Sequence, residues 1–324
     1  MIGVRKMVSR ALAAVAATLL ACAAAAQSWP SRPILLINAG APGTVTDIVA
    51  RQLAEQLASG LGQPVVEDSR PSAGGILALE ALARSPADGY TLGLVQSAQM
   101  SVAPSLFEHL PYDTVRDFAP IGILYRGPQV LVVNASLPVV SLAEFIRQAK
   151  ANPGRLRFSS TGNGTPTHMA MEQIKLLLDI DLQHIPYRGT GGHLAVVGGE
   201  VDAMVEGVAP LLPHIRAGKL RPLAVTGSQR VRVLPDVPTF VELGVHGLEP
   251  VWVGVVAPRG TPVAVVQRLH EAFVKCMMAP AIREPYEQLG RVVSPGTPDE
   301  MNSTVVEEIA RWRELVRRRG ITVN

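Results

Sequence analysis

Short runs of strand-forming residues alternate with helical patterns along most of this chain, and the connections between them are brief and rich in Gly and Pro. Such alternation predicts parallel α/β layers, because a helix must carry the chain back across the sheet before the next parallel strand can begin. The first unit reads as a buried strand at 34–37, a Gly/Pro loop and a helix at about 47–59. Val49, Leu53 and Leu57 recur every four residues and predict one apolar helix face.

Polar residues and glycines mark the ends of this first helix. Thr46 is the expected N-cap, and Asp47 suits the positive end of the helix dipole. Gly60 and Gly62 are expected to stop the helix. A second unit of the same kind follows, with a strand at 156–159, a loop at 160–164 and a helix capped by Thr165 with Pro166 at its first position.

The same alternation of strand and helix patterns recurs between and after these units. We expect strands at 65–66, 91–95, 122–125 and 130–133, helices at 75–84 and from Ser141 to about 152, and a last long helix from Thr297 to Gly320. The chain has 324 residues, 48% of them apolar and only 18% charged, so it can bury a large core and is neither disordered nor fibrous. That length predicts two domains.

The N-terminus reads as an export signal with a basic stretch at 1–10, an apolar run at 11–20 and small residues at 21–26. We expect cleavage after Ala26, because the apolar run is shorter than a spanning helix needs. An alternative is a lipoprotein, since the residues ending at Cys22 loosely resemble a lipidation box. No other stretch is long enough to span a bilayer, so the mature protein should be soluble and periplasmic.

Charge and cysteine content narrow the function classes. Removing Arg5, Lys6 and Arg10 with the signal takes the 30 Lys and Arg residues to 27, which equals the 27 Asp and Glu residues. A neutral chain has no overall field for gathering nucleic acid or an anionic membrane, so neither is an expected partner. Cleavage also leaves Cys276 alone in an apolar context, where a buried thiol is expected rather than a disulfide or a reactive group.

Enzyme and metal signatures are absent from the sequence. It contains no Walker phosphate loop, no nucleophile elbow, no zinc-protease helix motif and no dinucleotide fingerprint after a strand. The seven His residues show no short ligand spacing with Cys or carboxylates. We therefore expect no catalytic residues, no metal and no cofactor.

Two glycine-containing loops are the strongest binding signals. The loops at 40–47 and 160–165 each lead into a helix N-terminus, where free backbone N–H groups and the helix dipole favour a carboxylate or phosphate. One such loop lies in each half of the chain, which suggests a ligand clasped between two domains. Aromatic residues make up only 4% of the chain, whereas sugar and single-stranded nucleic-acid sites rely on aromatic stacking. A small carboxylate fits this composition.

Motifs that span nearly the whole chain after the signal resemble those of one protein family. They include the segments at 29–34, 41–51, 61–66, 87–92, 110–113, 162–168, 186–189, 198–202, 213–220, 234–239 and 257–262. In this order the motifs resemble those of the solute receptors of tripartite tricarboxylate transporters, the Bug family. The resemblance implies a two-domain, type II-like periplasmic binding protein of the Venus flytrap kind, with its ligand cleft between the domains. It also implies a monomer that captures a small carboxylate solute, delivers it to membrane transporter subunits and performs no catalysis.

The resemblance also implies domain bounds and ligand contacts. Domain I would comprise 27–125 plus 250–324, and domain II would comprise 126–249. The implied ligand contacts are Ala41, Pro42, Gly43, Thr46 and Asp47 in the first domain, Thr161, Gly162, Asn163, Gly164, Thr165 and His168 in the second, and also Ser97, Tyr187, Arg188 and Glu206. For Asp47, helix capping remains an alternative role, and for His168 domain packing does; Tyr187 and Arg188 could equally fix their loop.

Departures from the family pattern bear on specificity. Gly40, Thr44 and Val45 stand where Phe, Gly and Ser are usual, and Glu206-Gly207 stands where Asp-Asn is common. We expect a wider cleft beside Gly40 and like-charge repulsion of a second carboxylate by Glu206, which disfavours a small dianion. Two other classes stay open at this point: a sensing receptor that signals to a membrane partner, and a periplasmic enzyme using Asp47, His168 or Glu206.

Overall fold

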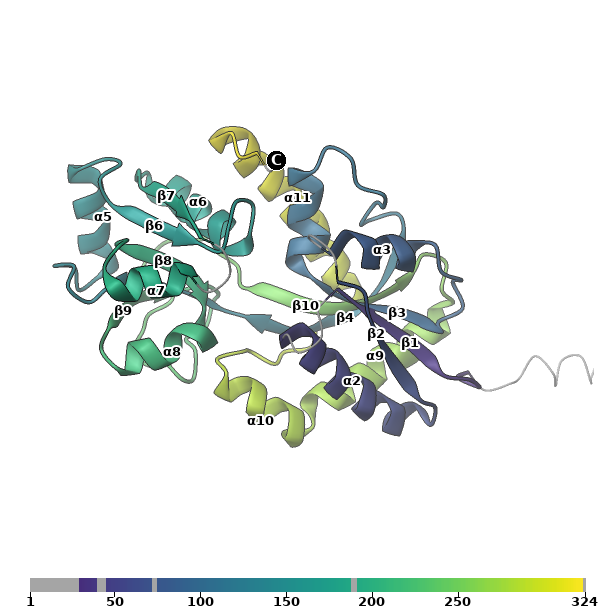
Figure 1. Ribbon diagram of the computed structural model, residues 1–324. Helices are drawn as coiled ribbons and strands as arrows, with labels where there is room; N and C mark the ends of the chain where they lie inside the picture. Colours follow the sequence, from purple (N-terminus) through teal and green to yellow (C-terminus); the bar gives the residue numbers. More distant parts are fainter. Residues whose placement is uncertain (1–28, 40–44, 72–74, 188–190, 323–324) are drawn as a thin grey trace, which may run out of the picture.

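Two five-stranded mixed sheets form the frame of the protein (Figure 1). The computed structural model describes residues 29–39, 45–71, 75–187 and 191–322. The first sheet has the strand order β2-β1-β3-β10-β4 and the second has the order β7-β6-β8-β5-β9. The strands are β1 (Ile34–Asn38), β2 (Val65–Ser69), β3 (Thr91–Gln96), β4 (Phe118–Gly127), β5 (Gln129–Asn134), β6 (Arg157–Ser160), β7 (Gln183–Pro186), β8 (Ala203–Gly207), β9 (Leu220–Val225) and β10 (Val251–Pro258). The α/β fold class expected from the alternation is confirmed, but the sheets are not wholly parallel as expected, because β10 and β5 run antiparallel to their neighbours.

Helices cover both faces of each sheet (Figure 1). They are α2 (Val45–Leu61), α3 (Ile76–Ala83), the π-helical turn η2 (Ala98–Val102), α4 (Ala103–Leu106), α5 (Leu142–Ala151), α6 (Pro166–Leu178), α7 (Gly191–Gly198), α8 (Val208–Arg216), α9 (Val263–Met278), α10 (Pro280–Gln288) and α11 (Pro298–Arg319). Across the described residues, none of these helices combines the length and apolar character needed to cross a membrane.

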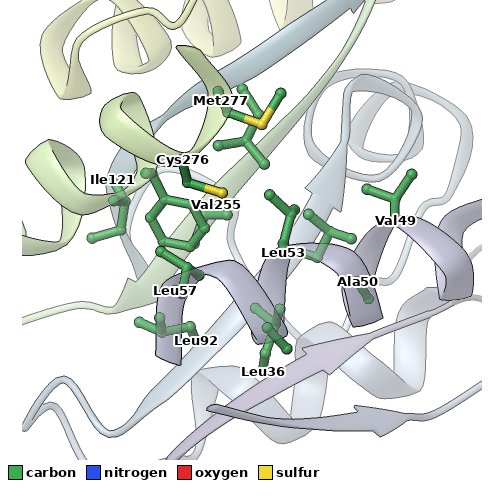
Figure 2. Close-up of a cluster of buried hydrophobic side chains, with 14 of the residues drawn as sticks. Leu36, Val49, Ala50, Leu53, Leu57, Leu92, Ile121, Val255, Cys276 and Met277 are labelled. Atoms are coloured by element: carbon green, nitrogen blue, oxygen red, sulfur yellow. The ribbon is translucent and has the colours of Figure 1, made fainter. Parts of the chain in front are cut away.

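Side chains of alternate strand residues pack into separate cores on the two faces of each sheet, because successive side chains of a strand point to opposite faces. In β1, Ile34 and Leu36 pack against α2 and α9, whereas Ile37 packs on the other face with α3 and α11. Figure 2 shows the first of these cores, in which the predicted stripe of Val49, Leu53 and Leu57 lies in α2.

Cys276 lies in the same core as that stripe, and its side chain is buried (Figure 2). Burial raises the pKa of the Cys276 thiol to about 11. This thiol is a free, buried group rather than a disulfide partner, as predicted.

The chain passes between the two sheets at neighbouring points. Pro128 separates β4 from β5, and the segment before Val251 brings the chain back into β10. The residues at these crossings pair within their own sheets, Gly127 with Val251 and Gln129 with Gly207. The domain division at 125/126 and 249/250 lies close to both crossings, and we keep it as a proposal.

Helix α11 touches both halves of the molecule. Its apolar side packs on the first sheet through Met301, Val305 and Ile309. Its last turns join a small core with Met169 of α6, and its final residue Arg319 pairs with Glu172 of α6, with 2.6 Å between Nε and Oε2. Arg317 and Arg318 pair with Glu314 on the surface. The arginine cluster therefore does more than complement the helix dipole, because one member joins the two halves.

Two local expectations at helix starts need correction. Helix α2 begins at Val45, so Thr46 is its second residue rather than the N-cap, and Asp47 still lies in the first turn. Thr165 does occupy the N-cap position of α6, but its side chain makes no capping bond. Its hydroxyl donates instead to the Gly162 carbonyl at 2.6 Å, which tightens the preceding loop. By contrast, Ser141 and Thr297 cap α5 and α11 as predicted.

Candidate functional site

The carboxyl ends of the parallel strands in the two sheets meet at the crossings. In the first sheet β1 is flanked by β2 and β3, and in the second β6 is flanked by β7 and β8. Where the connections of two neighbouring strands run to opposite faces of a sheet, a crevice forms at the carboxyl ends of those strands. Open α/β sheets bind their ligands in such a crevice. The connections from β1 to α2 and from β6 to α6 both occupy that position. These are the two connections that the sequence had singled out.

The loop after β6 is shaped by two glycines in backbone conformations that other residues rarely adopt. Gly162 has a φ of 133° and Gly164 a φ of 71°. Thr167, in the first turn of α6, fastens the loop: its hydroxyl accepts the Thr161 N–H at 2.9 Å and lies 3.0 Å from the Thr161 hydroxyl. Asn163 is exposed at the tip of the loop. Hydrogen bonds to the Thr167 hydroxyl thus fix the conformation of this loop.

His168 of α6 holds this loop through a hydrogen bond. Its Nδ1 accepts the Gly164 N–H at 3.0 Å, so that nitrogen carries no proton. Its ring is only 8% exposed and lies stacked on the ring of His184 at 4.0 Å between centroids. His184 in turn stacks on Phe158 at 4.7 Å and places Nε2 2.7 Å from the Ser160 hydroxyl. Of the two roles left open for His168, the structure shows packing and loop support.

Burial keeps both stacked imidazoles neutral. It lowers the pKa of His168, and the neighbouring Lys175 lowers that pKa further against the opposing effect of Glu172. Burial, together with the adjacent His168, lowers the pKa of His184 to about 4. At neutral pH the loop after β6 therefore contacts two uncharged imidazoles, those of His168 and His184.

A buried ion cluster lies one helical turn beyond His168. Glu172 and Lys175 of α6 are each 5% exposed, and their side chains pair at 2.8 Å between Oε1 and Nζ. Arg319 is a second cation on Glu172, and Asp181 lies 3.7 Å from Nζ of Lys175, so two cations face two carboxylates. Burial raises the pKa of Glu172, but Lys175 and Arg319 outweigh it and lower that pKa. The cluster borders an open polar pocket that reaches Asn163. It anchors the helix that carries the loop.

In the first half, the described part of the site is held by charges. Asp47 is 3% exposed and accepts two bonds from Arg51, at 3.1 Å from Nε and 3.0 Å from Nη2. Arg51 also reaches Glu67 of β2 at 3.3 Å, and Asn38 at the end of β1 donates to Glu67. Burial raises the pKa of Glu67, while Asp47 raises the pKa of Arg51. The Asp47 carboxylate is therefore fixed at the start of α2 by its own helix.

Several predicted contacts lie outside the described residues. These are Ala41, Pro42 and Gly43, the departures Gly40 and Thr44, the side chains of Val45 and Thr46, and Arg188. Residues 1–28, with the predicted signal and Cys22, lie outside them as well.

Ser97 lies at the carboxyl end of β3, on the same edge of the first sheet as Asn38. It is 6% exposed, and its hydroxyl accepts the Trp252 backbone N–H at 3.3 Å. The Trp252 indole donates to Glu308 of α11 at 3.0 Å. Ser97 thus connects the cleft edge of the first sheet with the buried side of α11.

Tyr187 directly follows β7, and Glu206 is the next-to-last residue of β8. Both strands neighbour β6 in the second sheet. The Tyr187 N–H donates to the Ser160 carbonyl at 3.0 Å. Glu206 accepts the Gly207 N–H at 2.7 Å and lies 3.2 Å from His193 of α7. Four residues that the sequence reasoning did not assign thus take part in the site, namely Arg51, Thr167, His184 and His193. Arg51 could have been found from its i,i+4 spacing to Asp47.

The described site is suited to holding a polar ligand rather than to chemistry. Within residues 29–322, apart from the gaps given above, no three His, Cys, Asp or Glu side chains gather as they would around a metal ion. The carboxylate of Asp47 and the Nδ1 atom of His168 are both occupied by hydrogen bonds within the protein. In the described loop the N–H groups of Thr161, Gly162 and Gly164 also donate within the protein. What remains for a ligand is the exposed loop tip at Asn163, hydroxyl groups and the Glu206–His193 pair.

Comparison with known proteins adds family evidence. Residues 49–321 match the model of the tripartite tricarboxylate transporter family receptor. The protein BugT of Bordetella pertussis is 37% identical over 304 residues, covering 93% of each chain. The structure of the periplasmic binding protein BugD shares 32% identity, covers 91% of this chain and 99% of that one, and superposes with a TM-score of 0.72. MatC from Rhodopseudomonas palustris with bound malate shares 32% identity, covers 89% of this chain and 100% of that one, and has a TM-score of 0.71.

Proposed function

Since the chain belongs to the tripartite tricarboxylate transporter receptor family, whose members are periplasmic solute-binding receptors and not enzymes, we propose that it captures one small organic acid for such a transporter. The solute is a carboxylate, or a carboxylate that also carries an amide or amine, and it is handed to the membrane subunits of the transporter. The observation that carries the proposal is the pairing of two strand-to-helix connections at the facing carboxyl edges of the two sheets.

In this proposal the acid is held by N–H groups in the first turn of each helix, because the N–H groups of Thr161 and Gly164 already donate to Thr167 and His168. A carboxylate there gains charge-assisted hydrogen bonds and the favourable end of two helix dipoles. In the second half the contacts are Thr161, Gly162, Asn163, Gly164 and Thr165, with His168 and Tyr187 holding the loop. In the first half they are Ala41, Pro42, Gly43, Thr46 and Asp47, with Ser97, Arg188 and Glu206 lining the remainder.

Calorimetry on the purified mature protein tests the capture of an acid. A panel of mono- and dicarboxylates, amides and nicotinate-like acids is titrated, and thermal melts are recorded with each. A true ligand at one hundred times its dissociation constant should add about 2.7 kcal/mol to the free energy of unfolding. Neutral analogues of the same shape should add nothing. A panel in which no acid binds would refute the proposal.

Export and assembly are part of the same proposal. The family's compartment supports removal of residues 1–26 and release into the periplasm as a monomer. Mass spectrometry of protein from the periplasmic fraction should find a chain beginning at Gln27. A lipid-modified chain beginning at Cys22 would replace this proposal with the lipoprotein alternative, and a dimer on size exclusion would refute the monomer.

A further inference from the structure

The carboxylate of Glu206 fills a helix N-terminus that faces the cleft. Gly207 is the N-cap of α8 and has no side chain with which to cap the helix. Oε1 of the preceding Glu206 accepts the N–H of this N-cap residue at 2.7 Å. A negative charge of the protein therefore already occupies the positive end of the α8 dipole.

His193 holds the other oxygen of this carboxylate. Its Nε2 lies 3.2 Å from Oε2 of Glu206, and donation to the carboxylate requires the proton on Nε2. The side chains of His193 and Glu206 are 12% and 19% exposed, so the pair is largely desolvated but still reachable. Tyr187 packs against Gly191 at the start of α7, the helix that carries His193. Gly207 and His193 thus each hold one oxygen of the Glu206 carboxylate.

The pair lies on the ligand edge of the second sheet. Strand β8 lies between β6 and β5, so Glu206 is one strand away from the loop at 161–164. Glu206 stands opposite Val130 of β5, next to the crossing at Gln129. A ligand whose carboxylate is held by the loop after β6 would present its far end to Glu206.

We propose that the Glu206–His193 pair selects a monocarboxylate whose far end carries a hydrogen-bond donor, such as an amide, an ammonium or a ring N–H, and rejects a second carboxylate. This inference rests on the proposed function. A second carboxylate would meet the like charge of Glu206 in a partly desolvated site. A donor group would find the carboxylate of Glu206 instead.

Matched pairs of ligands test the selection directly. The probes are succinate, glutarate and adipate, each compared by calorimetry with its half-amide, succinamate, glutaramate or adipamate. The wild-type protein should bind the half-amide of the fitting pair about tenfold or more tightly than the diacid. Glu206→Gln keeps an acceptor for Gly207 but removes the charge, so it should narrow that ratio about tenfold. Glu200→Gln, on the opposite edge of the sheet, should leave the ratio unchanged.

His193 acts through Glu206 and is tested as a positioning residue. His193→Leu should lower the ratio of half-amide affinity to diacid affinity. His193→Gln restores an N–H donor, so its affinity ratio should be close to that of the wild type. Circular dichroism and thermal melts establish that each variant is folded. If an acid binds but the diacid is preferred, and Glu206→Gln leaves the ratio unchanged, the inference is overturned and the proposed function stands. Binding of none of the probes to the wild type, nor of any acid in the wider panel, would overturn both.

Discussion

The two helices that begin at the cleft are fastened by opposite chemistry. At α2 the fastening is ionic: buried Asp47 is held by Arg51, whose side chain is 59% exposed and which also reaches Glu67. At the start of α6 it is neutral: Thr167 accepts the Thr161 N–H and His168 accepts the Gly164 N–H, while the ionic contacts of this helix, at Glu172, lie one turn further along. An exposed guanidinium tolerates change and is screened by salt, whereas short neutral hydrogen bonds are directional and depend on protonation. The two halves of one site should therefore respond to different perturbations.

The largest expected effect comes from breaking the neutral half at its backbone. Gly164→Val places a β-branched side chain at a φ of 71°, a conformation that it strongly disfavours, and blocks close approach of a ligand. We expect loss of measurable acid binding by calorimetry. Gly218→Val is the matched control, because Gly218 has a φ of 67° and lies at the opposite edge of the second sheet. It should lose comparable stability and keep its affinity.

Gly43→Val extends the same test to the first half. Gly43 lies outside the described residues, and the expectation comes from the sequence alone. Binding should fail there too if both loops grip the ligand. Undiminished affinity in both Gly43→Val and Gly164→Val would contradict capture by the two loops.

A smaller effect distinguishes the halves by pH. A histidine in the unfolded chain takes a proton near pH 6.5, but native His184 does so only near a pKa of about 4. The unfolded state therefore binds more protons between these values, and the free energy of unfolding falls as pH drops through that window. Glu67 acts in the opposite direction, because its raised pKa lets the native state take a proton first.

Urea unfolding at about pH 7 and about pH 5 measures this slope. The wild type should be less stable at the lower pH. His184→Phe keeps the stack on Phe158 and should flatten the slope, whereas His109→Gln at an exposed position should not. A slope that is identical in wild type and His184→Phe would show that the stack does not carry the pH dependence.

The smallest effect belongs to the ionic half. Arg51→Gln removes a mostly exposed partner, so ligand affinity should fall slightly at low salt. The difference from wild type should vanish near 1 M salt, where the screening length is about 3 Å. Arg84→Gln breaks a similar exposed i,i+4 pair with Glu80 on α3 and should leave affinity unchanged. A large loss that persists at high salt would mean that the ionic fastening is as strict as the neutral one.

The sequence predicted the parts of this molecule that depend on near neighbours in the chain. The stripe at Val49, Leu53 and Leu57 predicted the buried face of α2, and Gly62 follows its last residue, although Gly60, also expected to stop it, lies inside the helix. The loops leading into helix starts indicated where a candidate site could lie. The sequence could not predict that Arg319 pairs with Glu172, because the two lie 147 positions apart. The stack of His168 on His184 escaped prediction for the same reason, since it depends on how α6 packs against β7.

The buried thiol of Cys276 has a practical consequence for studying motion in this protein. A thiol with a pKa of about 11 is almost entirely protonated near neutral pH, and maleimide reagents attack the thiolate. Cysteines introduced at exposed positions, for example Ser303→Cys in α11 and Lys219→Cys before β9, should therefore accept fluorophores or spin labels selectively. Distances between such labels, recorded with and without an acid, would test whether the two halves move relative to each other, without removal of the native cysteine.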